Sequence, residues 1–388
     1  MLAFTILFGC GTNIDYSGAW QGLLQLEKNN IPFTFHLDKR DGKWDASFIN
    51  SKEVIHITDI NETEDSLFIN MEIFDTQFRL RKLNGILSGT YLRNYESNYQ
   101  IPFKAIKSTK RFENANTSNG EFTGRWKVTF TDEDGSFPAI GIFKSNDTTI
   151  TGTFITETGD YRYLEGVANE KFLQLSTFDG SHAFLFEAEL VNDTLSGGFW
   201  SGNHYYASWS GVRDDYYSLR SADSLTFLKD GFKKVDFTFL NEEGDSMKLA
   251  DLIGRPTIIQ LLGTWCPNCM DETKFLVEWL AENPDKNINV IGLAYEYGDS
   301  PSYAYKRINK LKSKLQVPYP IVYAGAYDKL EAAKTLPMLN AVISFPTLIF
   351  LDKTHDIKRI HTGFTGPGTG HYFEDFKIAF QKTIQELN

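Results

Sequence analysis

Cysteine is scarce in this chain, whose 388 residues contain only three, at positions 10, 266 and 269. A zinc site at Cys266 and Cys269 would need two further ligands. Cys10 is far away in the sequence, and none of the seven histidines forms a close pair with the spacing of helix-borne ligands. We therefore expect no metal site. The two neighbouring cysteines then form either a structural disulfide or a redox pair.

Positive charge and long apolar runs are also in short supply. The formal net charge of -11 argues against nucleic acid or an anionic membrane surface as a partner. No segment has the roughly 20 consecutive apolar residues that a membrane-spanning helix needs. Hydrophobic residues at 41% and charged residues at 23% are ordinary for a globular protein. A chain of this length can form two or three domains, each with its own core.

The cysteine pair stands at the junction of a predicted strand and a predicted helix. Residues 257–262 form an apolar run typical of a buried strand, and residues 270–283 predict a helix that ends before Pro284. Free backbone N–H groups and the helix dipole would favour a thiolate at Cys266. Cys269, one turn further on, would be close enough to attack a mixed disulfide on Cys266. This context favours the redox pair.

The Trp-Cys-Pro-Asn-Cys motif at 265–269 makes the chain resemble a known family. Residues 232–388 are similar to the TlpA/ResA-like thiol-disulfide oxidoreductases, which have the thioredoxin fold. Phe345 and Pro346, just before an apolar run, match the place where this family carries a cis-proline facing the cysteines. The resemblance implies that these two residues bind the substrate chain and that Trp265 shapes access to the pair. The alternative for Pro346 is a trans-proline that opens an edge strand.

Proton transfer to and from Cys269 calls for an acid or base beneath the cysteine pair. In thioredoxin itself a buried aspartate lies six residues before the first cysteine. Here that position is Gln260, which cannot titrate. The resemblance points instead to Glu296, after the second core strand, and to Glu272, three residues after Cys269. The alternatives are a solvated loop carboxylate for Glu296 and a first-turn complement to the helix dipole for Glu272.

Residues 18–214 have the pattern of a β-sheet protein. Short runs of alternating apolar and polar residues are separated by turn signals, with no convincing helix. The plan occurs twice, because Trp20 and Trp126 are each followed, at nearly the same separation, by a Leu-Ser-Gly sequence. This predicts a tandem duplication of one antiparallel unit, at 18–110 and 120–214, each a small barrel or sandwich. One larger closed structure built from both halves is the alternative.

A linker is predicted at 215–231, where the sequence is charged. The remainder, 232–388, predicts a short hairpin followed by the order β-α-β-α-β-α-β-β-α, which is a thioredoxin-like sheet with helices on both faces. The fold class is therefore multidomain, with two tandem all-β units followed by an α/β thioredoxin-like domain. The second β unit ends in aromatic residues, including Trp200, Tyr206 and Trp209. These rings either fill the core of the unit or line a pocket for a ligand or partner.

The first residues predict a membrane anchor. A short apolar segment ends at Gly9 and Cys10, which resembles the Leu-x-Gly-Cys lipobox of a bacterial lipoprotein signal, although no positively charged region precedes it. We therefore expect residues 1–17 to be a signal and anchor segment in which Cys10 is lipidated. The alternative is a disordered tail with a stray thiol.

The resemblance implies a lipid-anchored periplasmic or cell-envelope enzyme that reduces protein disulfides. Cys266 attacks the substrate disulfide and Cys269 resolves the mixed disulfide. No dissociable cofactor is expected, because the cysteines carry the electrons. The expected partners are oxidised substrate proteins, among them cytochrome c precursors, and a thiol donor in the membrane. The alternatives are disulfide introduction, and ligand or partner binding by the β units with an accessory redox domain.

Overall fold

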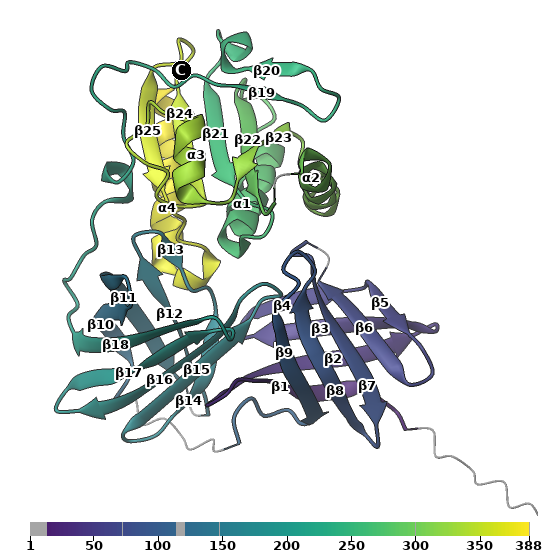
Figure 1. The fold of residues 1–388 in the computed structure, drawn as a ribbon. Coiled ribbons are helices and arrows are strands. Elements are labelled where there is room, and N and C mark those ends of the chain that lie inside the picture. Colours follow the sequence, from purple (N-terminus) through teal and green to yellow (C-terminus); the bar gives the residue numbers. More distant parts are fainter. Residues whose placement is uncertain (1–13, 72, 114–120, 147, 299, 388) are drawn as a thin grey trace, which may run out of the picture.

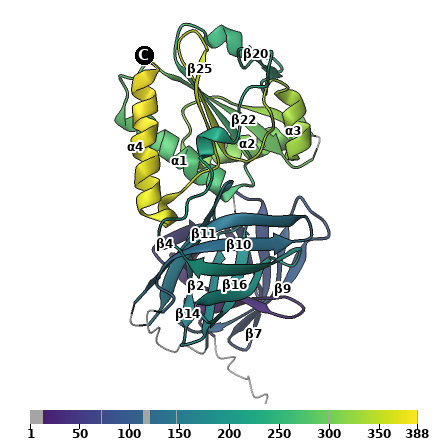
Figure 2. The ribbon, with the colours of Figure 1, turned by 90° about the vertical axis from the view of Figure 1, so that its left-hand side faces the viewer.

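The computed structural model describes residues 14–71, 73–113, 121–146, 148–298 and 300–387. Two antiparallel β-sheets lie side by side, and an α/β domain is stacked on them (Figures 1 and 2). The predicted fold class, two all-β units followed by a thioredoxin-like α/β domain, is confirmed.

The first sheet has nine strands in the order β4-β3-β2-β1-β9-β8-β7-β6-β5. The strands are β1 (Gly18–Gln25), β2 (Asn30–Arg40), β3 (Lys43–Asn50), β4 (Glu53–Ile57), β5 (Ile60–Glu62), β6 (Ser66–Met71), β7 (Thr76–Leu83), β8 (Ile86–Arg93) and β9 (Gln100–Lys107). Side chains of β3 and β6 alternate between buried and partly exposed, as the period-2 pattern of the sequence predicts. The buried face holds a cluster of phenylalanines that includes Phe33, Phe48 and Phe78.

The second sheet has the same plan and closes on itself. Its strands are β10 (Gly124–Asp132), β11 (Gly135–Ser145), β12 (Ile150–Thr156), β13 (Gly159–Asp160), β14 (Leu164–Ala168), β15 (Phe172–Phe178), β16 (Ala183–Val191), β17 (Thr194–Ser201) and β18 (Tyr205–Arg213). The order is β11-β10-β18-β17-β16-β15-β14-β12-β13, and β12 also pairs with β11, which closes the ring. The alternative of one larger closed structure from both halves is wrong, because each half forms its own sheet.

Equivalent residues in the two units make equivalent contacts. The indole Nε1 of Trp20 donates to the carbonyl of Tyr16, and that of Trp126 donates to the carbonyl of Phe122, in both cases four residues earlier. A lysine or arginine side chain from the last strand of the same unit lies over each indole ring. Together with the shared strand order, these contacts support the predicted repeat of one β unit.

The turn between β15 and β16 joins the two units. Phe178 belongs to the second unit, but its ring packs in the core of the first, 4.6 Å from the ring of Phe33 between centroids. The side chain of Asn50 accepts the N–H of Phe178 at 3.2 Å and donates to its carbonyl at 2.8 Å. Because a large apolar ring and a backbone pair are shared, the two units are packed as one body.

Replacing Phe178 with alanine should destabilise the β units by about 3–5 kcal/mol, since it removes a ring buried among other aromatic residues. Phe172 is the matched control, because it lies on the same strand but is 51% exposed. We expect Phe172→Ala to have little effect on the free energy of unfolding. Chemical denaturation followed by tryptophan fluorescence measures both variants, and equal losses would contradict the role given to Phe178.

The α/β domain has a mixed five-stranded sheet in the order β23-β22-β21-β24-β25. Its strands are β21 (Thr257–Leu262), β22 (Asn289–Glu296), β23 (Ile321–Ala326), β24 (Thr347–Leu351) and β25 (Ile357–Thr362), preceded by the hairpin of β19 (Thr238–Leu240) and β20 (Ser246–Lys248). The helices are α1 (Pro267–Glu282), α2 (Pro301–Leu315), α3 (Lys329–Thr335) and α4 (His371–Glu386), with short 3-10 turns η2 (Leu249–Leu252) and η3 (Pro367–Thr369). The element order is the one predicted from the sequence.

The predicted linker is packed against the α/β domain. It contains a 3-10 turn, η1 (Ala222–Ser224), in which the carboxylate of Asp223 contacts both Arg359 and His361 of β25 at 2.8 Å. Further on, Leu228 forms an isolated β-bridge with Leu339. These contacts hold the linker along the domain that follows it.

Cys10 and the rest of residues 1–13 lie outside the described part of the chain, so the lipid anchor stays a prediction. Among the helices that the structure describes, none combines the length and apolar character needed to cross a membrane.

Candidate active site

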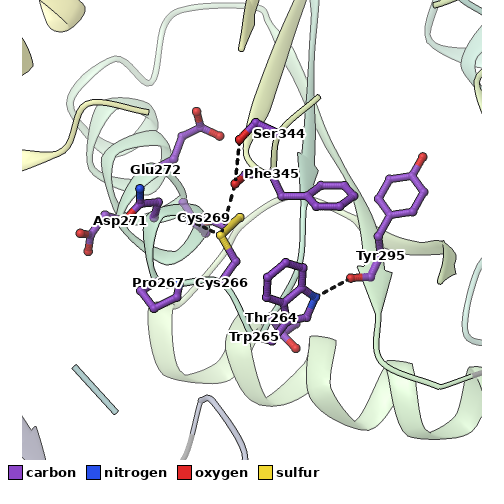
Figure 3. Close-up of a disulfide and its surroundings, with 12 residues drawn as sticks. Thr264, Trp265, Cys266, Pro267, Cys269, Asp271, Glu272, Tyr295, Ser344 and Phe345 are labelled. Carbon is purple, nitrogen blue, oxygen red and sulfur yellow. Dashed lines mark hydrogen bonds between the residues drawn. A yellow bond between two sulfur atoms is a disulfide. The ribbon is translucent and has the colours of Figure 1, made fainter. Parts of the chain in front are cut away.

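The two cysteines form a disulfide at the start of α1 (Figure 3). The helix begins at Pro267 and not at residue 270 as predicted, because proline needs no N–H partner at the first helical position. Cys266 caps the helix, and its Sγ accepts the backbone N–H of Cys269 at 3.2 Å. The first sulfur therefore lies at the positive end of the helix dipole, as expected for a stabilised thiolate.

A cis-proline loop faces the disulfide. The Phe345–Pro346 peptide bond is cis, so the geometry predicted for Pro346 is confirmed and the trans alternative is wrong. The Sγ of Cys266 lies 3.6 Å from the carbonyl oxygen of Phe345. Cys266 is 6% exposed and Cys269 1%. The structure thus brings the cysteines and the cis-proline together, while substrate binding by Phe345 and Pro346 stays a prediction.

Trp265 lies beside the pair, between the cysteine turn and the cis-proline loop (Figure 3). Its indole Nε1 donates to the carbonyl of Tyr295 at 2.9 Å. Its ring meets the rings of Phe345 and Tyr297 edge-on, with centroids 6.0 and 5.5 Å away. These contacts fix the indole at the edge of the site, where a substrate chain entering beside Cys266 would meet it.

Glu296 is the last residue of β22 and is buried, so the alternative of a solvated loop carboxylate is wrong. Its carboxylate accepts the backbone N–H of Thr264 at 2.8 Å and the hydroxyl of the same residue at 2.7 Å. Burial raises the pKa of Glu296 to about 7, although both hydrogen bonds from Thr264 oppose the shift. The carboxyl group of Glu296 is therefore bonded to Thr264, which lies two residues before Cys266, and its pKa is about 7.

The raised pKa of Glu296 predicts a pH dependence of stability. Its stabilising contribution is fully present below the ordinary pKa of 4.5 and is lost as the pH rises through about 7. Glu296→Gln does not titrate and keeps an acceptor for the N–H of Thr264. We expect the free energy of unfolding of the wild type to fall relative to this variant over that interval, by on the order of 3 kcal/mol. Parallel pH profiles of the two proteins in chemical denaturation would contradict this assignment.

Glu272 lies in the second turn of α1 and is fully buried, so the alternative of a first-turn complement to the helix dipole is wrong. Gln260 donates through Nε2 to one oxygen of Glu272 at 2.9 Å. The hydroxyls of Tyr319 and Thr273 donate to the amide oxygen of Gln260, which fixes the orientation of the amide. Within the described part of the chain, the second oxygen of Glu272 has no hydrogen-bond partner. Burial raises the pKa of Glu272 well above its ordinary value, against the hydrogen bond from Gln260.

A buried carboxyl group is therefore present although Gln260 itself cannot titrate. Glu272 follows Cys269 by three residues on the helix, so their side chains share one face. The sequence contained this signal, since a carboxylate at this spacing from a buried cysteine must itself face inward. Among the described residues, no three histidine, cysteine, aspartate or glutamate side chains gather as metal ligands would.

The aromatic residues of the second β unit do not line one pocket. Trp209 is 2% exposed in the core of the unit, where its Nε1 contacts the carbonyls of Glu187 and Gly198. Trp200 and Tyr206, with ring centroids 5.2 Å apart, both line an open surface cavity. Trp200 is half-buried and also packs against the core of the first β unit. The core interpretation is therefore correct for Trp209, whereas Trp200 and Tyr206 line a cavity without it.

Sequence reasoning missed the residues that the β units bring to the cysteines. Four residues of the second β unit bond to residues within two positions of Cys266 or to the cis-proline loop: Thr158, Asp160, Arg162 and Ser181. No local pattern marks them, because each contact joins residues at least 84 positions apart in the sequence.

The fold and the site define a class of protein. A sheet in the order β23-β22-β21-β24-β25, a CxxC disulfide at the start of α1 and a cis-proline facing it form a thioredoxin-like redox domain. Residues 231–360 match the model of the AhpC/TSA family. The thiol-disulfide oxidoreductase ResA of Halalkalibacterium halodurans is 24% identical over 148 residues, which are 38% of this chain and 76% of the relative. The thioredoxin-like protein YneN of Bacillus subtilis is 24% identical over 136 residues, which are 35% and 73% of the two chains.

Solved structures give similar matches. A secreted thiol-disulfide isomerase from Corynebacterium glutamicum aligns with a TM-score of 0.31 and 20% identity over 44% of this chain and 98% of its own. A thiol:disulfide interchange protein from Chlorobium tepidum aligns with a TM-score of 0.29 and 16% identity over 39% and 99%. By its family match and its relatives, the C-terminal domain of this chain is a thioredoxin-like domain related to ResA-type thiol-disulfide oxidoreductases, an enzyme domain of disulfide redox type.

Proposed function

We propose that this chain reduces protein disulfides with the Cys266–Cys269 dithiol. The observation that carries this proposal is the position of the cysteine pair. Cys266 caps α1 at the positive end of its dipole, and its sulfur lies 3.6 Å from the carbonyl of Phe345 in the cis-proline loop. Disulfide exchange needs a nucleophilic sulfur beside backbone that can pair with the incoming chain, and the position of Cys266 next to the cis-proline loop supports this role.

In the first step the thiolate of Cys266 attacks one sulfur of a substrate disulfide. The substrate S–S bond breaks, a mixed disulfide forms on Cys266, and the other substrate sulfur leaves as a thiolate that takes up a proton. The backbone at Phe345 and Pro346 pairs with the extended substrate chain, and Trp265 limits the direction from which it enters.

In the second step the thiolate of Cys269 attacks the sulfur of Cys266. The Cys266–Cys269 disulfide forms and the second substrate thiol is released, so two electrons have passed to the substrate. The proton of Cys269 passes to Glu272, which follows it by three residues on α1 and has one oxygen without a hydrogen-bond partner among the described residues. A raised pKa suits this role, because it brings the pKa of the carboxyl group closer to that of a thiol. Glu296 is the second candidate for the relay, acting beside Thr264.

The proposed setting is extracytoplasmic. Lipidation at Cys10 would hold the protein on a bacterial membrane in the periplasm or cell envelope, where oxidised proteins, cytochrome c precursors among them, are available as substrates. A membrane dithiol donor returns the pair to the reduced state after each turnover. The cysteines themselves carry the electrons, so the proposal requires no dissociable cofactor.

Cys269→Ser should trap substrate proteins as mixed disulfides on Cys266, because the resolving thiol is absent while the attacking thiol remains. Cys266→Ser is the matched control, and we expect it to trap none. Non-reducing electrophoresis of the purified variants, incubated with a disulfide-containing protein such as insulin, measures the adducts. Adducts on both variants in equal amount would contradict the assigned roles.

The reduction potential of the pair decides the direction of the reaction. Equilibration against dithiothreitol should give a value near or below roughly −270 mV, as for a reductase. A value near roughly −120 mV would make the chain a disulfide-introducing oxidant instead.

A further inference from the structure

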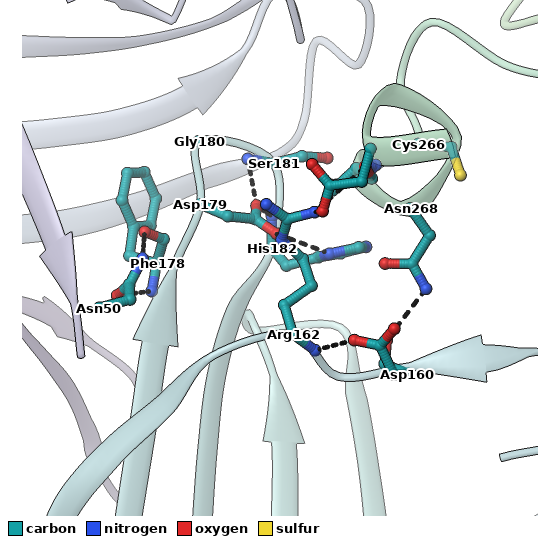
Figure 4. Close-up of polar contacts among 12 residues, drawn as sticks. Asn50, Asp160, Arg162, Phe178, Asp179, Gly180, Ser181, His182, Cys266 and Asn268 are labelled. Atoms are coloured by element: carbon teal, nitrogen blue, oxygen red, sulfur yellow. Dashed lines mark hydrogen bonds and ion pairs between the residues drawn. The ribbon is translucent and has the colours of Figure 1, made fainter. Parts of the chain in front are cut away.

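Residues on both sides of Cys266 are bonded to the second β unit. Figure 4 shows this unit beside the cysteine turn, with Asn268 bonded to Asp160. The hydroxyl of Ser181 donates to the carbonyl of Trp265 at 3.0 Å. The guanidinium of Arg162 donates to the carbonyl of Pro267 at 3.2 Å. The backbone carbonyls of the residues before and after Cys266 thus both accept hydrogen bonds from side chains of the second β unit.

The β12–β13 hairpin closes the site from the direction of the cis-proline loop. The carbonyl of Thr158 accepts the hydroxyl of Ser344 at 2.7 Å, one residue before Phe345. Asp160 accepts the side-chain amide of Asn268 at its carbonyl, at 3.0 Å, and the N–H of Gly366 at its carboxylate, at 2.6 Å. The hairpin segment 158–162 therefore spans the distance between the CxxC turn and the loop that would hold a substrate chain.

Two further hydrogen bonds join the α/β domain to the β units at the edges of this contact. The hydroxyl of Tyr303 in α2 donates to the carboxylate of Asp75 in the first β unit at 2.7 Å. Arg125 of β10 donates to the hydroxyl of Tyr372 in α4 at 2.9 Å. The contact therefore extends well beyond the cysteine turn and involves both β units.

We propose that segment 158–162 occupies the substrate-binding surface of the redox pair, so that a protein substrate must displace it before exchange. The inference rests on the function proposed above. A protein partner must lay its chain beside Cys266 and against the cis-proline loop, and the β units already fill both positions. A small reagent needs only the sulfur. A protein partner would therefore have to separate the β units from the redox domain and take the place of segment 158–162.

The test introduces a larger side chain at Gly159. Its φ is +141°, and an added Cβ would lie 2.6 Å from the amide nitrogen of Asn268. Gly159→Val therefore displaces the side-chain amide of Asn268 and breaks its hydrogen bond to the carbonyl of Asp160, which loosens the hairpin from the CxxC turn. Gly135→Val is the matched control, because Gly135 has a φ of +134° on the same β unit but no atom within 4 Å of the added Cβ. Both variants suffer the same kind of backbone strain.

The measurement compares two reductants of the Cys266–Cys269 disulfide in the full chain. A small phosphine and excess reduced thioredoxin are each mixed with the oxidised protein, and the freed thiols are counted by alkylation and mass spectrometry. Gly159→Val should raise the rate with thioredoxin by about tenfold, as a loss of ~1.4 kcal/mol of docking free energy would. The rate with the phosphine should stay unchanged, and Gly135→Val should match the wild type with both reductants.

A second variant covers the case in which Gly159→Val does not fold. Tyr303→Phe combined with Tyr372→Phe keeps both rings and removes only the two hydroxyls at the edges, so we expect the same selective gain on a smaller scale. An unchanged ratio of the two rates in the opened variants, or an equal gain with both reductants, would overturn the inference. A disulfide that neither reductant opens would instead refute the proposed function, which is a different result.

Discussion

One buried arginine connects the three parts of the molecule. The guanidinium of Arg162 forms ion pairs with Glu53 of the first β unit, Asp179 of the second and Asp271 of α1, and it also donates to the carbonyl of Pro267. A buried cation is stable only when it is paired, and removing one partner of such a group is strongly destabilising. The charge therefore holds both β units against the helix that carries the cysteines.

The residues next to Asp179 also link the two β units to each other and to the redox site. It follows Phe178, whose ring packs in the other unit, and lies two residues before Ser181, which bonds to the turn containing Cys266. Burial raises the pKa of Asp179, but His182 and Arg162 together hold it below its ordinary value. The aspartate therefore stays ionised beside the arginine.

The sequence was sufficient where the determinants are local. The CxxC turn and the order of strands and helices depend on neighbouring residues and on hydrophobic period, whereas the cis geometry at Pro346 was implied by the family resemblance alone. The predicted start of α1 at residue 270 is wrong because proline favours the first helical position, so the helix begins at Pro267. No local pattern marks Arg162, since its partners Asp271 and Pro267 are over one hundred positions away in the sequence. Only the folded structure shows that the redox site lies at the contact between the β units and the α/β domain.

The central claim is that the β units and the redox domain form one docked body held at Arg162. Amide hydrogen exchange on the full chain tests it directly in the wild type and in Arg162→Met, which keeps the length of the side chain without its charge. Segments 158–163 and 265–272 should both exchange at least about tenfold faster in the variant, because breaking a buried ion pair costs roughly 3–5 kcal/mol. The central strands β17 and β21 should keep their wild-type protection. If segment 265–272 stayed as protected as in the wild type, the redox site would not depend on this arginine and the account would be wrong.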